Sequence, residues 1–257
     1  MNYIDIVNTL YSSLILKYKI IGIKLINSKE EYEKIDFKEP SKALNYCAMV
    51  RMAAMGTAYK AKEADFKCKS APRVLGINPS DTLNDKGQRW ASWGLYKDDK
   101  TAFNVRSKLN YFKEQNYGVV IAPIENYLNL PDVIIFICNP YNAMRIFQGY
   151  TYSYGICDNL EVIGNQAICY ESTTRILQNK NISISFLCTG TRHKAGWGDD
   201  DMSIGINKKC LEGIARGILN TINPMEHDKK KKIIEENLKL NKIDYKIEYS
   251  CNYYKKA

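Results

Sequence analysis

The chain has 257 residues, and its 37 lysines and arginines against 28 aspartates and glutamates give a formal net charge of +9. Hydrophobic residues at 45% and charged residues at 25% are ordinary globular values, which excludes wholesale disorder. No apolar run approaches the roughly 20 residues of a membrane-spanning helix. The N-terminus has no basic segment before its apolar stretch and no small-residue cleavage site, so we expect a cytoplasmic protein that does not partner a membrane.

The positive charge is spread along the chain, and its one dense run is Lys229–Lys232. Acidic and apolar residues follow this run at helical spacing, which predicts a solvated C-terminal helix. The sequence has no zinc-finger, helix-turn-helix or RNA-binding signature, so a nucleic-acid partner is not favoured.

Apolar periodicity and turn residues predict helices and strands that alternate along the chain. In chain order we expect a helix at 2–17, a strand at 20–26, a helix at 42–55 capped by Ser41 and ended by Gly56, a strand at 57–66, turns with a short helix after Cys68, a helix at 100–114, strands at 118–124 and 132–138, a helix at 139–150, a strand at 160–164, a helix at 165–177, strands at 182–188 and 202–206, and a helix at 207–221. This order predicts an α/β fold with mixed sheets covered by helices.

Two segments of the chain match when their cysteines are aligned. In each segment a cysteine near the start of a helix is followed by a strand that ends at a second cysteine. Twenty residues separate Cys47 from Cys68 and 18 separate Cys169 from Cys188, and a glycine stands eight positions after each second cysteine. The match predicts an internal duplication, and two such halves would bring the four thiols together at their interface.

The expected organisation is therefore a single domain over residues 1–225. It would consist of two similar αβ halves, or pseudo-repeats, at about 20–80 and 117–206. A lysine-rich helical extension over residues 226–257 would follow. A homo-oligomer is compatible with this organisation.

Four converging thiols indicate a metal centre. Thiolates are soft ligands that suit iron–sulfur clusters or, as the alternative, zinc. The chain has eight cysteines and two histidines, so a metal site would be largely thiolate. It has no Cys-x-x-Cys motif, so the fold itself would have to assemble the ligands, which we expect to be Cys47, Cys68, Cys169 and Cys188.

Each of these cysteines is followed four to six positions later by an arginine: Arg51, Arg73, Arg175 and Arg192. Nearby cations favour thiolates and anionic groups, so the arginines would suit a negatively charged cluster, a reactive thiolate or a bound small anionic ligand. Arg216 also follows Cys210 by six positions, so the pattern is not exclusive to the four.

Two other functions stay open. One is a metal-free thiol enzyme with Cys188 or Cys47 as nucleophile, and the other is a binding protein for a small anion held by Arg51 and Arg192. Whether the chain is an enzyme is left open. Cys138 and Cys210 are expected to be small buried hydrophobic residues.

Three weaker candidates stand beside the cysteines. Asp199, Asp200 and Asp201 would bind Mg²⁺ if two of them shared a face, although a solvated turn is favoured. His193 would act as a base for Cys188 only in an unusual arrangement. Tyr150, Tyr152 and Tyr154 would lie on one face of the chain if this segment were extended. They would then line a flat ligand pocket or, as the default, pack on a half-exposed sheet. The sequence has neither a P-loop nor a dinucleotide-binding glycine motif.

Several segments resemble the domain-of-unknown-function 169 family, found mainly in anaerobic bacteria and archaea. The resemblance covers roughly residues 10–220, and its segments are NYCAMVRMAAMG, DFKCKSAPRVLG, GVVIAPIE, PDVIIFICNPYNAMRI and ISISFLCTGTRHKAGWGDDD. It implies that the four cysteines match the family's recurring cysteine positions. His193 departs from the usual residue of the family. The resulting expectation is a metal centre in redox or cofactor-related metabolism of an anaerobe, served by an unknown redox partner.

Overall fold

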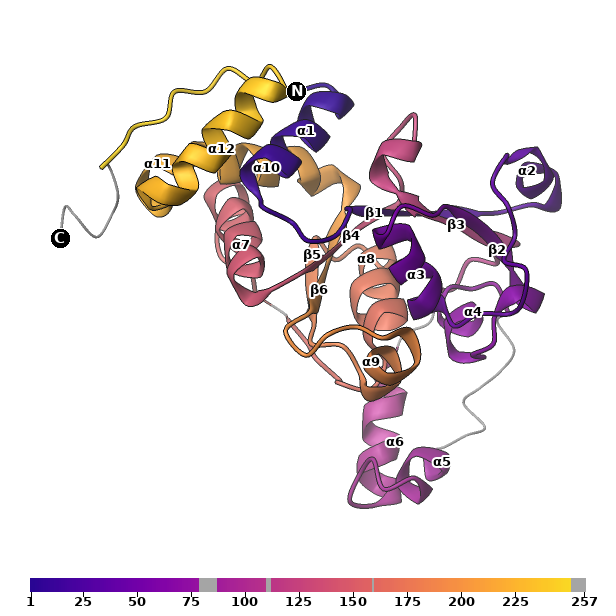
Figure 1. The fold of residues 1–257 in the computed structure, drawn as a ribbon. Coiled ribbons are helices and arrows are strands. Elements are labelled where there is room, and N and C mark those ends of the chain that lie inside the picture. The colour runs from indigo at the N-terminus through magenta and orange to yellow at the C-terminus, as the bar shows by residue number, and fades with distance from the viewer. Residues whose placement is uncertain (79–86, 110–111, 159, 251–257) are drawn as a thin grey trace.

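The computed structural model describes residues 1–78, 87–109, 112–158 and 160–250 (Figure 1). Within these ranges, no helix combines the length and the apolar character that a membrane crossing requires.

The described strands form one six-stranded sheet with the order β2-β3-β1-β4-β6-β5. The strands are β1 (Ile21–Ile26), β2 (Tyr59–Lys62), β3 (Gly118–Pro123), β4 (Val133–Cys138), β5 (Ile182–Ser185) and β6 (Met202–Asn207). The central strands β1 and β4 are joined through Ile21–Ile135 and the two following residue pairs.

The helices are α1 (Tyr3–Ser13), α2 (Lys29–Lys34), α3 (Tyr46–Ala54), α4 (Ser70–Val74), α5 (Gln88–Ser92), α6 (Asp99–Ser107), α7 (Pro140–Tyr154), α8 (Arg175–Leu177), α9 (Thr189–Ala195), α10 (Leu211–Asn220), α11 (Ile222–Met225) and α12 (Asp228–Leu240). Short 3₁₀ turns are η1 (Glu63–Asp65), η2 (Ile124–Asn126) and η4 (Lys208–Cys210), and η3 (Ala167–Thr174) is a π-helix. Figure 1 shows α5 and α6 projecting from the body of the protein.

The α/β class is confirmed, but the expected mixed sheets are wrong, because each neighbouring pair of these strands is antiparallel. The reason lies in the strand order. The segment that contains α3 connects β1 to β2, and these two strands run in the same direction with β3 inserted between them. The same holds for β4 and β5, with β6 inserted. Each unit is thus a split βαβ motif, which the sequence pattern cannot distinguish from a plain βαβ unit.

The strand order is symmetric about the β1–β4 pair. On one side of it lie β3 and then β2, and on the other side lie β6 and then β5. Two equivalent halves would produce this order, although the duplication itself stays a prediction. By strand order the first half extends through β3, whereas the expected second repeat begins at residue 117, just before that strand.

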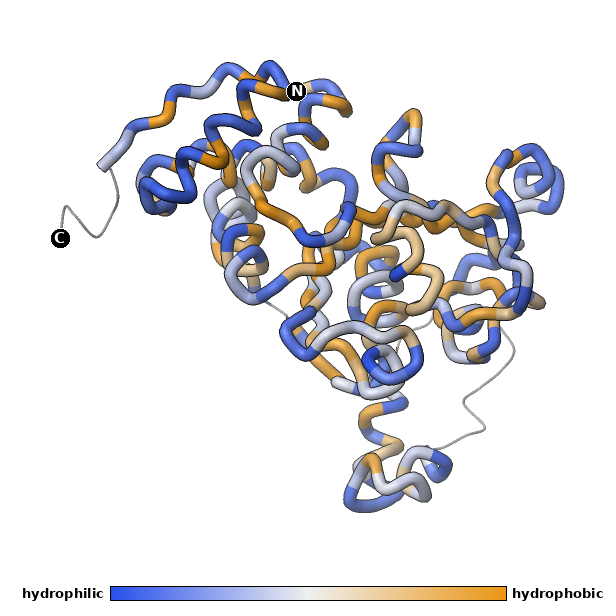
Figure 2. The backbone as a smooth tube through the Cα atoms, viewed as in Figure 1, coloured by the Kyte–Doolittle hydropathy of each residue, from blue (hydrophilic) through white to orange (hydrophobic). Residues whose placement is uncertain are grey.

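Helices cover both faces of the sheet, and alternate residues of the central strands point to opposite faces. Ile135 and Ile137 of β4 belong to a first core that α3, α4, η3 and α9 also line. Ile134 and Phe136 belong to a second core lined by α1, α7 and α10. Figure 2 shows the hydrophobic residues concentrated along these strands. Because both faces are buried, the strands are continuous apolar runs, which is why the sequence predicts them well.

Several boundaries differ from the expected ones. The α3 helix begins after Asn45, so Ser41 does not cap it. The expected strand at 160–164 is wrong, because residues 160–163 have no regular structure. Tyr150, Tyr152 and Tyr154 lie in α7, which extends to Gly155, so they do not form an extended stripe. Helical hydrogen bonding continues through this tyrosine-rich stretch despite its strand propensity.

The C-terminal segment forms its own small apolar cluster around Ile222, Ile234 and Leu238, and its helix α12 contacts α1. Arg145 of α7 and Glu226 form a fully buried ion pair with Nε and Oε1 2.8 Å apart. The Tyr141 hydroxyl donates to the other oxygen of Glu226 at 2.5 Å. The lysine-rich helix is α12, but it is not wholly solvated: Lys231 is fully buried and donates to the Glu248 carbonyl at 2.6 Å.

Candidate four-cysteine site

Cys47 and Cys188 lie at the beginnings of helices. Cys47 is the second residue of α3, whose Met49, Val50 and Ala53 pack into the first core. Cys188 is the N-cap of α9, and its sulfur accepts a hydrogen bond from the Thr191 amide at 3.4 Å. Both cysteines are partly exposed. Each sulfur is therefore placed near backbone amides that favour negative charge.

Cys68 lies between η1 and α4, and Cys169 lies in the π-helix η3. This helix packs closely on β6, where a Cβ built on Gly205 would lie 2.0 Å from the Ser172 carbonyl oxygen. A glycine is therefore required at position 205 for η3 to lie where it does. Runs of π-helix are rare and occur frequently at functional sites.

The four sulfurs act on one another electrostatically. Burial raises the pKa of the Cys47 thiol to about 11, with contributions from Cys68 and Cys188. Burial also raises the pKa of Cys169 well above its usual value, and here Cys68, Cys188 and Cys47 all contribute. All four residues pack against the first core. The structure thus brings together four thiols that are far apart in the sequence.

The four positions correspond across the symmetric strand order. Cys47 and Cys169 lie in the connections from β1 to β2 and from β4 to β5, and Cys68 and Cys188 follow β2 and β5. As placed, the described residues contain no group of three or more histidine, cysteine, aspartate or glutamate side chains close enough to hold a metal ion.

Threonine hydroxyls connect the segments that carry the cysteines. Tyr46, next to Cys47, shares a hydrogen bond of 3.0 Å with Thr173 of η3. The Thr174 hydroxyl contacts the carbonyl oxygens of Val74 and Cys169, each at 2.9 Å. These bonds join α3 and α4 to the π-helix. Neither threonine could be predicted from the sequence, because a hydroxyl within a helix carries no signal of its own.

Glu171 is a second feature that the sequence analysis missed. Its carboxylate is fully buried and accepts hydrogen bonds from the Gly164 amide at 3.0 Å and from the Ser185 hydroxyl. Ser185 in turn accepts from the Leu187 amide at 3.2 Å, directly before Cys188. Glu171 therefore links the helix of Cys169 to the chain that leads into Cys188. The sequence shows only an acidic residue two positions after Cys169, and its burial emerges from the tertiary structure.

The four predicted arginines are placed differently from one another. Arg51 donates to the Ala195 carbonyl at 3.0 Å and thereby joins α3 to α9. Arg175 is buried and pairs with Glu161 at 3.1 Å. Arg192 donates to the carbonyls of Phe186 and Asp201. Arg73 follows Cys68 in α4 and lines a shallow cavity with Glu63 and Lys69. Their role as ligand-binding residues stays a prediction.

The remaining cysteines lie apart from this group. Cys138 and Cys210 are buried in the second core, as expected of small hydrophobic residues. Cys157 packs at the edge of the same core, and Cys251 lies outside the described residues.

The weaker candidates have structural partners or are exposed. Asp201 is buried and accepts hydrogen bonds from the Tyr18 hydroxyl at 3.0 Å and the Gly198 amide at 2.8 Å. Asp199 and Asp200 are exposed in the turn before β6, which fits the favoured solvated turn. His193 is exposed on α9.

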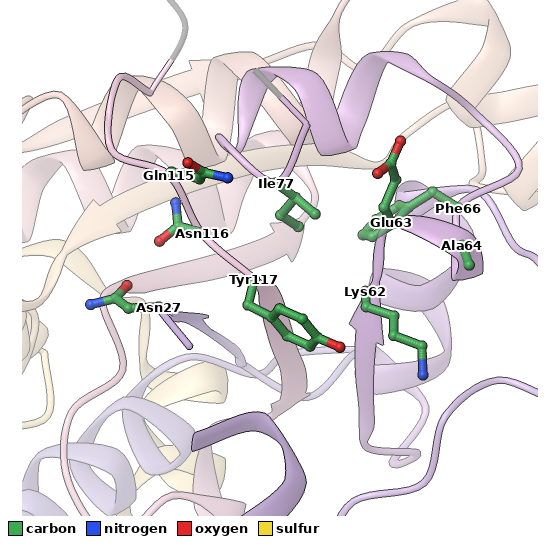
Figure 3. A pocket seen from close by; sticks show the side chains of 9 residues that line it. All are labelled: Asn27, Lys62, Glu63, Ala64, Phe66, Ile77, Gln115, Asn116 and Tyr117. Atoms are coloured by element: carbon green, nitrogen blue, oxygen red, sulfur yellow. The ribbon is translucent and has the colours of Figure 1, made fainter. Parts of the chain in front are cut away.

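A cavity of about 690 Å³ opens beside the outer strand β2 (Figure 3). Lys62, Glu63 and Phe66 line one side of it and Asn116 and Tyr117 line the other. The Asn116 amide donates to the Leu75 carbonyl at 2.9 Å, so this side chain fastens the loop after α4. None of the residues that line the cavity is a cysteine, so it is distinct from the four-thiol group.

Comparisons with known proteins agree with the resemblance seen in the sequence. An uncharacterised protein of Methanocaldococcus jannaschii is 26% identical over 212 residues, which are 80% of this chain and 88% of that protein. No solved structure matches the chain significantly. The model of the domain-of-unknown-function 169 family, described as uncharacterised ArCR, matches residues 9–217, which include all four cysteines. The chain belongs to this family.

Proposed function

We propose that the protein binds a thiolate-ligated metal centre through Cys47, Cys68, Cys169 and Cys188. An iron–sulfur cluster is the first candidate and zinc is the alternative. The protein would serve redox or cofactor-related metabolism in the cytoplasm. The observation that carries the proposal is that four cysteines at corresponding places in the strand order pack against one core, where the other cysteines help to raise the pKa values of Cys47 and Cys169.

The donor set fits such a centre. Four sulfurs without a histidine ligand suit iron–sulfur clusters or structural zinc. Burial raises the pKa values of the Cys47 and Cys169 thiols, so these two hold their protons, and a bound cation would replace the protons and neutralise the thiolates. The described cysteines are free thiols, as a reducing compartment would keep them.

A bound iron–sulfur cluster would supply one-electron transfer, whereas zinc would stabilise the fold. In either case this chain's residues hold the ligands. The π-helix positions Cys169, and the Glu171–Ser185 bond joins it to the segment of Cys188.

The two alternatives have less support. A nucleophilic cysteine needs a lowered pKa, whereas burial raises the pKa of the Cys47 thiol to about 11, which disfavours Cys47 and leaves Cys188 as the candidate nucleophile. An anion would have to bind the remaining donors of Arg51 and Arg192, because each guanidinium already donates to backbone carbonyls, although the buried Nε of Arg51 has no partner among the described residues.

The test is purification without oxygen, followed by measurement of iron, zinc, acid-labile sulfide and the visible spectrum. We expect stoichiometric metal, with sulfide and a charge-transfer absorption if a cluster is bound. A colourless protein that stays metal-free after reconstitution with iron and sulfide or with zinc, and that shows all its thiols titratable, overturns the proposal.

A further inference from the structure

The hydroxyl group of Thr191 lies beside the sulfur of Cys188. Its Oγ1 is 3.0 Å from that sulfur, and the residue is only 3% exposed. Thr191 is also a neighbour of the Cys47 thiol, which arrives from α3 in the other half of the protein and whose raised pKa it partly offsets. One buried hydroxyl therefore bonds one of the four thiols and lies near a second.

This contact follows from local helix geometry. Cys188 caps α9, and the amide of the residue three positions later donates to the capping side chain. That residue is Thr191, so its side chain leaves the helix on the side of the capped sulfur. The packing of α3 against α9, fastened by the bond from Arg51 to Ala195, then brings Cys47 to the same hydroxyl.

The first half lacks this group. The position three residues after Cys68 is occupied by Ala71, which has no hydroxyl and is fully buried. The corresponding turns of the two halves therefore differ in one hydrogen-bonding group.

We propose that Thr191 is a positioning residue of the metal centre, whose hydroxyl hydrogen-bonds the sulfur of Cys188 and would hold that thiolate in the orientation that metal binding requires. This inference rests on the proposed function. Groups that hydrogen-bond metal ligands fix their orientation, and their loss typically reduces metal affinity by about 10- to 100-fold. The hydroxyl has a single proton, so it donates to one thiolate at a time.

The test compares the rate of metal loss to excess chelator from metal-loaded wild type and variants. Thr191→Val keeps the shape of the side chain and removes the hydroxyl, and we expect metal loss to be faster by about tenfold or more. Thr191→Ser keeps the hydroxyl and should release metal close to the wild-type rate. Thr189→Val is the matched control, because Thr189 lies on the same helix with its side chain exposed.

The outcomes separate the two claims. Wild type that binds no metal overturns the proposed function and with it the inference. If wild type and Thr191→Val both bind metal and release it at the same rate, this result overturns the inference about Thr191 but not the proposed function. Circular dichroism verifies that the variants are folded, and Thr191→Ala, which adds no bulk, replaces the valine variant if that one does not fold. Equal loss of metal from the serine and valine variants also overturns the inference, because the effect then does not depend on the hydroxyl.

Discussion

Tyr46 and Thr173 share a buried hydrogen bond of 3.0 Å, although 127 positions separate them in the chain. Tyr46 precedes Cys47, and Thr173 lies four residues after Cys169 in the π-helix. The bond therefore connects the helices that carry corresponding cysteines of the two halves.

Tyr46→Phe removes this bond and should lower the free energy of unfolding by about 1 kcal/mol, because the Thr173 hydroxyl keeps its contact with the Ile168 carbonyl. Urea denaturation measures the change. Tyr59→Phe is the control, since the Tyr59 hydroxyl meets only the Met52 sulfur at 3.6 Å. A loss no larger in Tyr46→Phe than in the control contradicts the prediction.

Gly205→Ala should destabilise the fold by roughly 1–3 kcal/mol, because the added methyl group must displace the Ser172 carbonyl of η3. The displacement would also shift Cys169, so the variant should bind less metal. Gly190→Ala serves as the control for stability alone, because a Cβ there meets its nearest neighbour, the Cys188 sulfur, at an ordinary 3.9 Å. Equal denaturation midpoints for the two variants disprove the predicted clash.

The π-helix shows where prediction from the sequence reaches its limit. The apolar pattern of residues 165–177 predicts a helix, and a helix is present, but its close packing on β6 depends on Gly205 of a strand some thirty residues later. The central strand β4 was predictable because its burial is complete on both faces. The strands β3 and β6 were predicted as well, but their insertion between parallel strands was not, because such an insertion leaves the local pattern unchanged. The four cysteines were identified by their spacing, whereas Thr191 and Glu171 act through contacts that only the tertiary structure creates.

Replacing any one of Cys47, Cys68, Cys169 and Cys188 by serine should reduce bound metal strongly, because a hydroxyl is a poor substitute for a thiolate ligand. Cys157→Ser should retain the metal, since Cys157 packs beside the second core. Metal analysis after identical anaerobic purification measures the effect. Full metal content in all four single variants would falsify the ligand assignment.

The stability of the metal-free protein should fall at alkaline pH. The Cys47 thiol titrates at about 11 in the folded protein and near 9.0 otherwise, so the folded state holds its proton more tightly. The stabilisation is complete below about pH 9 and is lost as the pH rises toward 11. Denaturation at a series of pH values should show a smaller alkaline loss in Cys47→Ser than in wild type. Identical pH profiles would exclude this contribution.

Glu226→Ala should be among the most destabilising substitutions, at about 3–5 kcal/mol, because it leaves the Arg145 guanidinium buried without its counterion. Glu33→Ala removes a partner of the exposed Lys29–Glu33 pair and should cost less than about 1 kcal/mol. Thermal or urea denaturation compares the two. Similar small losses would mean that the C-terminal segment contributes little to the fold.

The symmetric strand order distributes the thiols evenly, with Cys47 and Cys68 in one half and Cys169 and Cys188 in the other. Two thiols are too few for a tetrahedral ion or a cubane, so neither half could retain a metal by itself. A centre bound by all four cysteines would connect the two halves across the β1–β4 strand pair. Its metal content, or the colour of a cluster, would then report whether both halves are folded and correctly packed together.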